Sequence, residues 1–341
     1  MNDLDIKINI LDELGNFLSQ FSKVNVNYNT LNKLIDSNIE NNSWFSKESI
    51  IYSLKSWSKV LKKDIIKNWI NEYDISSFNK KKTVALILPG NIPLVGFHDI
   101  LCVWLLGYKG LVKLSSKDNI LTPYLIKYLE KKSKVKTFNI KKSIIKNFDA
   151  VIATGSNNTS LYFDYYFSKY PNIIRNNKNS IAVLDGNESV KDLKNLGMDI
   201  LLYYGFGCRN VSKIFVPKKY DLNKIFKGLK SFSNSIKNSK YANNYHYNKA
   251  IYLINKDKFL DNGFFILKEN SKISAPISCA YFEYYNNKND LDYKITTIKK
   301  EIQCIVSQSQ IVKGIPFGQT QQPSLNDYAD NIDTMKFLMK I

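Results

Sequence analysis

The spacing of hydrophobic positions changes near residue 82, and this change separates two kinds of predicted structure. Before it, residues 5–21 and 46–73 carry apolar side chains at intervals of three and four, which predicts helices. After it, short apolar runs of strand length alternate with helical patterns. Such alternation is typical of a parallel, doubly wound sheet. We therefore expect an α/β protein with a helical lead-in.

The alternating part begins with four predicted strands and their connections. Strands are expected at 83–88, 110–114 and 149–153, a weaker strand near 137–140, and helices at 93–106 and 122–132. In doubly wound sheets, ligands bind beyond the carboxyl ends of the strands. The residues that follow these strands are therefore the candidates for a binding site.

Polar and small residues follow three of these strands. Asn91 follows the first, Lys113, Ser115 and Ser116 end the second, and Thr154, Gly155 and Ser156 follow the fourth. The last group also begins a helix, whose N–H groups and dipole attract a phosphate. The same residue types form ordinary helix caps, so each signal alone leaves both interpretations open. No GxGxxG motif is present.

A cysteine next to glycines stands out between a predicted helix at 191–204 and a strand at 212–217. Gly205 and Gly207 precede Cys208, and glycine lets the backbone approach a substrate closely. A thiol at the end of an element is where a nucleophile is expected. The alternative is an ordinary turn with a small, buried, apolar cysteine.

Arginine is rare, and one of its two positions adjoins this cysteine. Among 49 Lys and Arg residues only Arg175 and Arg209 are arginines. The planar guanidinium of Arg209 can anchor a substrate phosphate or pair with a carboxylate of the protein, and both interpretations stay open.

Composition limits the classes of partner. A chain of 341 residues with 44% hydrophobic residues can bury a large core and is expected to form two domains. The net charge of +19 is spread as lysine, whereas nucleic-acid readers rely on arginine, so we expect no nucleic-acid partner. The surplus charge would instead attract phosphate-bearing cofactors.

Four scattered cysteines and two histidines make a metal site unexpected. The N-terminus lacks the apolar core of a signal peptide, which predicts a cytoplasmic protein with reduced thiols. The most apolar run, residues 92–106, is too short to be an integral membrane segment and is interrupted by His98 and Asp99. We expect these two residues to be a helix-face pair.

Five motifs in order resemble the aldehyde dehydrogenase superfamily: residues 88–94, 111–116, 153–156, 205–208 and 316–318. Residues 90–99 and 208–213 more closely resemble its acyl-CoA reductase (LuxC-type) branch, which includes the long-chain fatty acyl reductase of bacterial luminescence. The resemblance covers roughly residues 80–341. It implies a helical lead-in (1–75), a Rossmann-like NAD(P)-binding domain (76–180), an α/β catalytic domain (181–312) and a tail that closes the fold (313–341).

The resemblance also implies roles for single residues. Cys208 matches the nucleophile, and Asn91 matches the amide that joins the cysteine N–H in an oxyanion hole. Lys113, with Ser115 and Ser116, matches the segment at the adenosine ribose of the cofactor. Thr154, Gly155 and Ser156 match the helix start near the pyrophosphate, and Phe317 matches the closing tail beside the cofactor.

Two departures from the superfamily pattern bear on the expected reaction and on the expected cofactor. Val183 stands where aldehyde dehydrogenases have the glutamate that activates water, with Glu188 five positions later, and valine cannot accept a proton. Ser116, followed by Lys117, stands where NAD-specific members often have a glutamate that would repel a 2′-phosphate. The expected cofactor is NADPH, with NADH as the alternative.

The resulting hypothesis is an acyl-CoA reductase. It would reduce an acyl-CoA or another acyl thioester, with a fatty acyl chain favoured, to an aldehyde through an acyl-cysteine. The alternatives are an NAD(P)-dependent aldehyde dehydrogenase, an acyl-phosphate reductase of the same superfamily, or a basic binding protein without the chemistry. A homo-oligomer is left open.

Overall fold

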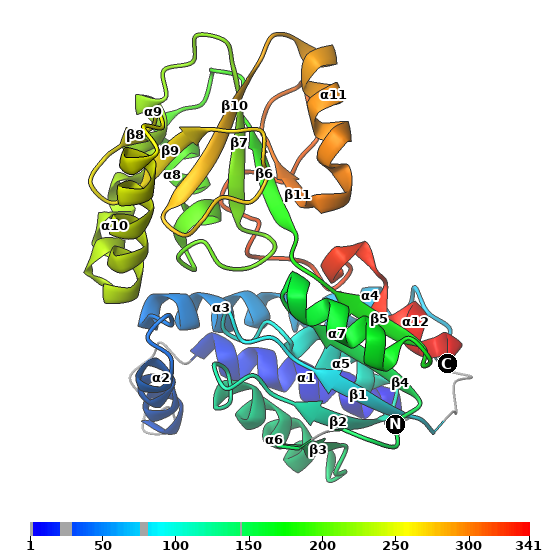
Figure 1. Cartoon of the computed structure of the whole chain (residues 1–341). Helices are drawn as coiled ribbons and strands as arrows, with labels where there is room; N and C mark the ends of the chain where they lie inside the picture. The colour runs from blue at the N-terminus through cyan, green and yellow to red at the C-terminus, as the bar shows by residue number, and fades with distance from the viewer. Residues whose placement is uncertain (1–2, 21–28, 76–80, 144) are drawn as a thin grey trace. The chain divides into compact units, whose positions relative to one another are not determined.

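The computed structural model describes residues 3–20, 29–75, 81–143 and 145–341, which form two compact units (Figure 1). The first unit contains Met1–Asn177 and Ser324–Ile341, and the second contains Lys178–Pro323. Each unit is built on a β-sheet of its own. The α/β class expected from the sequence is confirmed.

The first unit contains a parallel sheet. Its strands are β1 (Thr83–Ile87), β2 (Lys109–Lys113), β3 (Phe138–Ile140), β4 (Ala150–Thr154) and β5 (Asn172–Arg175), in the order β3-β2-β1-β4-β5. Its helices are α1 (Asp3–Gln20), α2 (Asn29–Asn41), α3 (Lys47–Val60), α4 (Lys63–Ile70), α5 (Phe97–Leu105), α6 (Leu121–Ser133), α7 (Asn157–Phe167) and α12 (Thr334–Lys340), with the 3-10 turn η4 (Ala329–Asn331) before the last. Each pair of neighbouring strands is parallel, as predicted for a doubly wound sheet.

Side chains of β1 alternate between the two faces of this sheet. Val84 and Leu86 belong to the large core of the unit, together with residues of α5. Ala85 and Ile87 belong to a smaller cluster on the other face, with Phe163 of α7. Helices therefore cover both faces along β1, which explains its nearly continuous apolar sequence.

The helix expected at 46–73 is two helices, α3 and α4, separated at Leu61. α1 packs against this break, since a Cβ on Gly15 would lie 2.3 Å from the Leu61 carbonyl oxygen. Asp12 of α1 accepts a hydrogen bond from the backbone N–H of Lys63 (2.9 Å), at the start of α4. The break thus depends on tertiary contacts, which hydrophobic periodicity does not reveal.

The second unit contains a mixed sheet with the order β11-β6-β7-β10-β9-β8. Its strands are β6 (Asn179–Val183), β7 (Val211–Pro217), β8 (Leu260–Asp261), β9 (Ile266–Glu269), β10 (Cys279–Tyr285) and β11 (Ile302–Val306). Its helices are α8 (Val190–Leu201), α9 (Asn223–Leu229), η2 (Lys230–Lys237), α10 (Ser239–Ile254), α11 (Lys288–Ile298) and η3 (Lys299–Glu301). The neighbouring strands are parallel except β8 and β9.

The C-terminal segment packs into the first unit through a chain of hydroxyl groups. The Tyr328 hydroxyl accepts a hydrogen bond from Trp69 Nε1 (2.8 Å) and lies 2.6 Å from the Tyr73 hydroxyl. The His98 ring lies 5.1 Å from the ring of Tyr328, and its Nε2 lies 2.9 Å from the Leu325 carbonyl oxygen. These contacts join α4 and α5 to residues that are more than 220 positions later in the chain.

A buried ion pair joins three elements of the same unit. Arg175 donates to both carboxylate oxygens of Asp99 in α5 (2.7 and 3.0 Å) and to the Thr334 hydroxyl of α12 (2.9 Å). Both charged side chains are almost fully buried. Asp99 and its neighbour His98 therefore make structural contacts.

No described helix combines the length and apolar character that a membrane crossing would require.

The ion pair generates a prediction about stability. Arg175→Met should lower the free energy of unfolding by about 3–5 kcal/mol, because it leaves the Asp99 carboxylate buried without a countercharge. The double variant Asp99→Leu/Arg175→Met should recover part of this loss. Urea unfolding of the three proteins measures both effects. A loss below about 1 kcal/mol in the single variant would mean that the pair behaves like an exposed salt bridge.

Candidate functional site

Cys208 lies in a tight turn between α8 and β7. The Gly207 carbonyl accepts a hydrogen bond from the Asn210 N–H (3.1 Å), which places Cys208 at the second position of a four-residue turn. Gly205 and Gly207 have φ values of +91° and +95°, in the left-handed region that favours glycine. Because the peptide bond is trans, the Cys208 N–H points opposite to the Gly207 carbonyl, and thus out of the turn.

Ser180 of β6 holds this turn through two hydrogen bonds. Its hydroxyl donates to the Cys208 carbonyl (3.0 Å), and its backbone N–H donates to the Asn210 carbonyl (3.0 Å). The Cys304 thiol of β11 lies 2.9 Å from the same hydroxyl. Since the single proton of Ser180 is directed to Cys208, the Cys304 S–H is the donor in that second contact. We name residues 207–210 the nucleophile turn after the role that the sequence predicts for Cys208, and this turn is therefore fixed by two neighbouring strands.

Burial distinguishes Cys208 from two of the other thiols. Cys102 and Cys279 are buried, and this burial raises the pKa of Cys102 well above its ordinary value and that of Cys279 to about 12. Such thiols stay protonated and inert. Cys208 and Cys304 are half-buried, but Cys304 lies within a strand. Cys208 is thus the cysteine whose place in a loop suits a nucleophile.

The strand after the nucleophile turn is fastened to a second loop. The Ser212 hydroxyl donates to the Ile273 carbonyl (2.6 Å), and the buried Lys213 ammonium donates to the carbonyls of Asn270 (3.0 Å) and Ser271 (2.7 Å). Lys213 also pairs with Glu283 of β10 (2.5 Å). Burial lowers the pKa of Lys213, although Glu283 opposes this effect. The loop at 270–273 is therefore fastened to the strand that follows Cys208.

Phe317 is buried in the second unit, where Asp199 of α8 holds its segment. The Asp199 carboxylate accepts hydrogen bonds from the backbone N–H of Gly318 (2.6 Å) and from the N–H and hydroxyl of Thr320 (3.1 and 2.7 Å). Burial raises the pKa of Asp199 to about 6 against the effect of these hydrogen bonds. α8 thus holds the Phe317 segment and also leads into the nucleophile turn.

Val183 and Glu188 both make structural contacts within the second unit. Val183 is fully buried in an apolar cluster that includes Phe215. Glu188 Oε1 accepts hydrogen bonds from the backbone N–H groups of Asp185 (2.6 Å) and Gly186 (3.3 Å). The valine lies in a core, and the glutamate caps the turn after β6.

Asn91 lies in the loop after β1 of the first unit. A Cβ on the preceding Gly90 would lie 2.7 Å from the Ser115 side chain, so only glycine lets this loop meet the loop after β2. Asn91 Oδ1 is buried and has no hydrogen-bond partner within the described residues. A buried amide oxygen without a partner is uncommon and is typical of functional positions.

A buried carboxylate holds the loop of Asn91. Asp118 Oδ2 accepts hydrogen bonds from the Leu94 N–H (3.0 Å) and the Thr122 hydroxyl (3.0 Å). Leu94 has a φ of +59°, which is strained for leucine and is stabilised here by that bond. Burial raises the pKa of Asp118 to about 6, whereas its hydrogen bonds act to lower it.

Two asparagines at the C-terminal end of α2 hold the loop that contains Ser115 and Ser116. Lys113 is exposed at the end of β2, and Ser116 is exposed in the loop that follows. Asn41 Nδ2 donates to the Ser116 carbonyl (3.0 Å), and Asn42 Nδ2 donates to the next carbonyl (3.2 Å). The helical lead-in therefore positions this loop.

The segment after β4 begins α7. Ser156 is the N-cap residue, and its side chain accepts a hydrogen bond from the Thr159 N–H (3.3 Å). A Cβ on Gly155 would lie 2.9 Å from the Thr159 Cβ, so glycine is needed for the close approach of the strand end to the helix. Thr154 ends β4, which pairs with β1, so it lies at the same edge of the sheet as the loop of Asn91.

The structure thus assembles two groups of predicted residues. The carboxyl edge of the first sheet gathers Asn91, Lys113, Ser115, Ser116, Thr154, Gly155 and Ser156. The second unit contains Cys208, Arg209 and Phe317, with Arg209 in the nucleophile turn and Phe317 attached to α8.

Residues 19–240 of the chain match the sequence profile of the acyl-CoA reductase (LuxC) family. This match spans more than half of the chain and includes both Asn91 and Cys208. The chain belongs to the acyl-CoA reductase family. It is accordingly an oxidoreductase that acts on aldehyde or acyl groups.

Solved aldehyde dehydrogenases share the fold of this acyl-CoA reductase family member. Aldehyde dehydrogenase 21 from Physcomitrella patens is similar with a TM-score of 0.67 at 12% identity, over 100% of this chain and 84% of that chain. KauB from Pseudomonas aeruginosa is similar with a TM-score of 0.64 at 12% identity, over 90% and 72% of the two chains. An indole-3-acetaldehyde dehydrogenase in complex with NAD⁺ gives 0.65 at 12% identity, over 91% and 72%. A comparison with curated protein sequences finds no match. The expected aldehyde dehydrogenase-like fold is confirmed.

Several residues that support the site of this family member carry no motif. Ser180, Asp118 and Asp199 are single polar residues in apolar surroundings, and each fixes a loop on which a predicted site residue lies. Their one sequence signal is a polar side chain inside a strand or helix pattern. Asn41 and Asn42 give no signal, because a helix of the lead-in has no visible relation to a loop some 75 residues later.

The raised pKa of Asp118 predicts how stability depends on pH. The folded protein holds this proton with a pKa of about 6, compared with an ordinary value of 3.8. Asp118 therefore favours the folded state below about pH 4, and this contribution is lost as the pH rises through 6. Between pH 4 and 7, the wild type should lose about 2 kcal/mol of unfolding free energy relative to Asp118→Asn, whose amide oxygen can still accept both hydrogen bonds.

Urea unfolding across this pH range tests the expectation. Asp36→Asn, at an exposed carboxylate of α2, is the control and should follow the wild-type curve. Parallel pH curves for the wild type and Asp118→Asn would contradict the expectation.

Proposed function

We propose that this protein reduces a fatty acyl-CoA thioester to an aldehyde with NADPH, through an acyl-enzyme on Cys208. The observation that carries the proposal is the nucleophile turn, which places a half-buried thiol beside an outward-directed backbone N–H in a member of the acyl-CoA reductase family. A nucleophile and an oxyanion donor in one turn suit acyl transfer.

In the first step, the Cys208 thiolate attacks the carbonyl carbon of the acyl-CoA. The tetrahedral oxyanion is stabilised by the Cys208 N–H and by the side-chain amide of Asn91. As the carbonyl re-forms, the bond to the coenzyme A sulfur breaks and that sulfur leaves as a thiolate. Cys208 then carries the acyl group as a thioester. Ser180 supports this step by holding the Cys208 carbonyl, which keeps the turn from rotating.

In the second step, the acyl group on Cys208 is reduced. The nicotinamide cofactor, when bound, supplies a hydride to the thioester carbon. The Cys208 N–H and Asn91 stabilise the negative charge on the oxygen again. The carbon–sulfur bond then breaks, its electron pair returns to Cys208, and the aldehyde leaves.

The described residues at the carboxyl edge of the first sheet fit a dinucleotide. Gly90 and Gly155 let the loops after β1 and β4 pack closely against Ser115 and Thr159, and both precede side chains that can hydrogen-bond. The capped start of α7 offers N–H groups to a phosphate, and Lys113 is exposed beside it for the adenosine ribose. An aldehyde dehydrogenase of this fold has been solved with NAD⁺, which supports a nicotinamide cofactor here.

The preference for NADPH rests on the loop after β2. Ser116 and Lys117 are both exposed and offer a hydroxyl and an ammonium to a 2′-phosphate. The hydrogen bonds of Asn41 and Asn42 to the backbone of this loop hold both side chains in place.

The fate of the acyl-enzyme depends on whether a base can activate water. Val183 lies in an apolar core, and Glu188 accepts two backbone hydrogen bonds through Oε1, while its Oε2 is buried. The valine offers no base and the second carboxylate oxygen is shielded from water, so the acyl-enzyme would persist until a hydride arrives. This supports reduction over oxidation to a free acid.

The first test removes the nucleophile. Cys208→Ala should abolish both acyl-enzyme formation from labelled palmitoyl-CoA and NADPH oxidation, because no other group can carry the acyl chain. Cys304→Ser is the control, since it keeps a donor for Ser180 and should retain most of the turnover. Single-turnover labelling and aldehyde detection measure the two steps. Substantial turnover in Cys208→Ala would overturn the mechanism.

The second test concerns the cofactor. Ser116→Glu should raise the Michaelis constant for NADPH by about tenfold or more, while the constant for NADH changes little, because a carboxylate would repel the 2′-phosphate. Ser133→Glu, at the end of α6, adds the same charge away from this loop and should change neither constant. Initial rates with both cofactors give the comparison. Equal effects of Ser116→Glu on NADPH and NADH would place this residue away from the adenosine ribose.

A further inference from the structure

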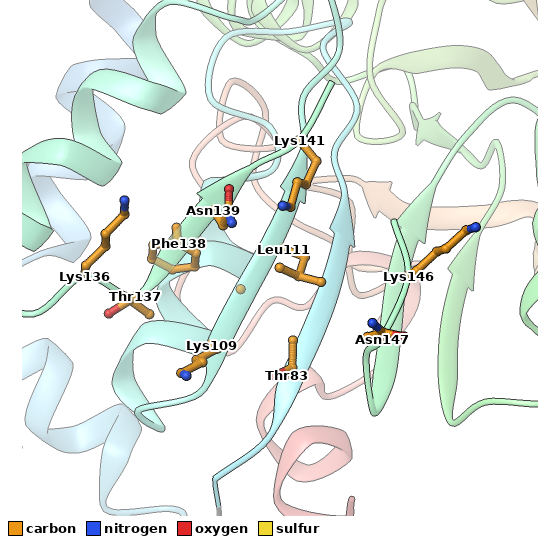
Figure 2. Close-up of a pocket in the computed structure, with 11 residues that line it drawn as sticks. Thr83, Lys109, Leu111, Lys136, Thr137, Phe138, Asn139, Lys141, Lys146 and Asn147 are labelled. Atoms are coloured by element: carbon orange, nitrogen blue, oxygen red, sulfur yellow. The ribbon is translucent and has the colours of Figure 1, made fainter. Parts of the chain in front are cut away.

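A cavity of about 410 Å³ lies on one face of the first sheet (Figure 2). It is lined by the first halves of β1, β2 and β3 and by the segment that leads from β3 to β4. None of the residues proposed to hold the dinucleotide lines it. The cavity therefore lies mainly over the amino-terminal halves of these strands, and of its lining residues Lys141 reaches it from the carboxyl edge at which that cofactor is expected.

The strand register explains why this face is open. In-register neighbours on parallel strands point to the same face, which puts Lys109 beside Thr83, and Leu111 beside Asn139. Lys141 lies two residues after Asn139 and continues the ladder through its N–H bond to the β2 backbone (2.8 Å). On this face Leu111 is thus flanked along β2 by lysines 109 and 113, and Lys141 lies level with the second of them, whereas the face of a buried parallel sheet is normally apolar.

The described residues between β3 and β4, 141–143 and 145–149, form no helix. This connection therefore does not cover this part of the sheet with a helix. Leu111 is consequently only partly buried, although it lies in the middle of the sheet. Figure 2 shows Lys141 extending from the end of β3 toward Leu111, with Lys109 and Lys136 at the β3 side of the cavity. Lys146 also contributes to the lining, but its ammonium points away.

The charge of the cavity is unbalanced. Four lysines and no carboxylate line it. Two carboxylates hydrogen-bond to the backbone of lining residues without lining the cavity themselves: Asp149 binds the Thr83 N–H (2.7 Å) and Lys82 (3.5 Å), and Glu130 binds the backbone N–H groups of Thr137 and Phe138 (2.9 and 2.7 Å). An excess of ammonium groups over carboxylates attracts an anion.

The remaining lining indicates a nucleotide as the anion. Leu111 gives the cavity an apolar floor, and the hydroxyl and amide groups of Thr83, Thr137, Asn139 and Asn147 surround it. Its volume falls within the range of about 300–1,000 Å³ of small-molecule sites, and a single phosphate would leave most of it empty. An apolar floor with hydrogen-bonding walls suits a base and a sugar, and separated lysines suit more than one phosphate.

We propose that this cavity binds a nucleotide that carries at least two phosphates, with Lys109 and Lys141 as its main cationic ligands. The site is additional to the dinucleotide site and does not depend on the proposed reaction.

Isothermal titration calorimetry of the full-length protein with ADP tests the proposal. Lys109→Gln/Lys141→Gln should weaken ADP binding at least tenfold, and Lys141→Glu alone should weaken it similarly. The charge-matched control Lys240→Gln/Lys288→Gln changes two exposed lysines of the second unit and should alter the affinity less than twofold. Lys113→Gln reports on ADP bound at the carboxyl edge. Adenosine and inorganic pyrophosphate should each bind at least tenfold more weakly than ADP.

Each other outcome counts against the proposal. No ADP binding by the wild type, or equal ADP affinity in the wild type and both cavity variants, would exclude this site. A loss of affinity in Lys113→Gln alone would assign the ADP to the carboxyl edge. Pyrophosphate binding as tight as that of ADP would show that the cavity recognises phosphate without a nucleoside. Thermal unfolding of every variant verifies that the exposed substitutions leave the fold intact.

Discussion

Parallel strand pairing is the constraint on which the arrangement of the first unit depends. Because neighbouring strands run in one direction, the loops after β1, β2 and β4 must meet at a single edge, although the ends of β1 and β4 are 67 residues apart in sequence. Glycine at position 90 then allows two of these loops to touch. In the second unit the same pairing of β6 with β7 places Ser180 beneath the nucleophile turn.

Buried carboxylates complete what strand pairing begins. Asp118 and Asp199 each hold a loop through its backbone N–H groups, and both have a pKa that burial raises to about 6. Burying an ionised carboxylate lowers the free energy of unfolding at neutral pH. At these two positions the same carboxylates fix the conformation of a loop. Such an arrangement is reasonable where a thiol and an amide must keep a set orientation relative to their own unit.

The elements that follow from local periodicity could be predicted, and those that follow from long-range contacts could not. The sequence pattern predicted the strands near 83–88, 110–114 and 149–153 and, with a later start, the helix at 93–106. In each of them apolar residues recur at the spacing of a strand or a helix. The break at Leu61 was missed because it depends on Gly15 and Asp12 of another helix. The candidate residues were found through short motifs, whereas Ser180 and Asp118 act through single hydrogen bonds that leave no pattern in sequence.

The buried pair of Arg175 and Asp99 also bears on the unusual composition of the chain. Lysine supplies nearly all of its positive charge, with two arginines among 49 cationic residues. At position 175 a lysine would present one ammonium where three oxygens of Asp99 and Thr334 require a planar fork, so that replacement would be selected against. In a chain that otherwise uses lysine, a buried arginine with three oxygen partners marks a place where geometry matters more than charge. Arg209 in the nucleophile turn is the other arginine of the chain, and thus the next position at which to test for such a requirement.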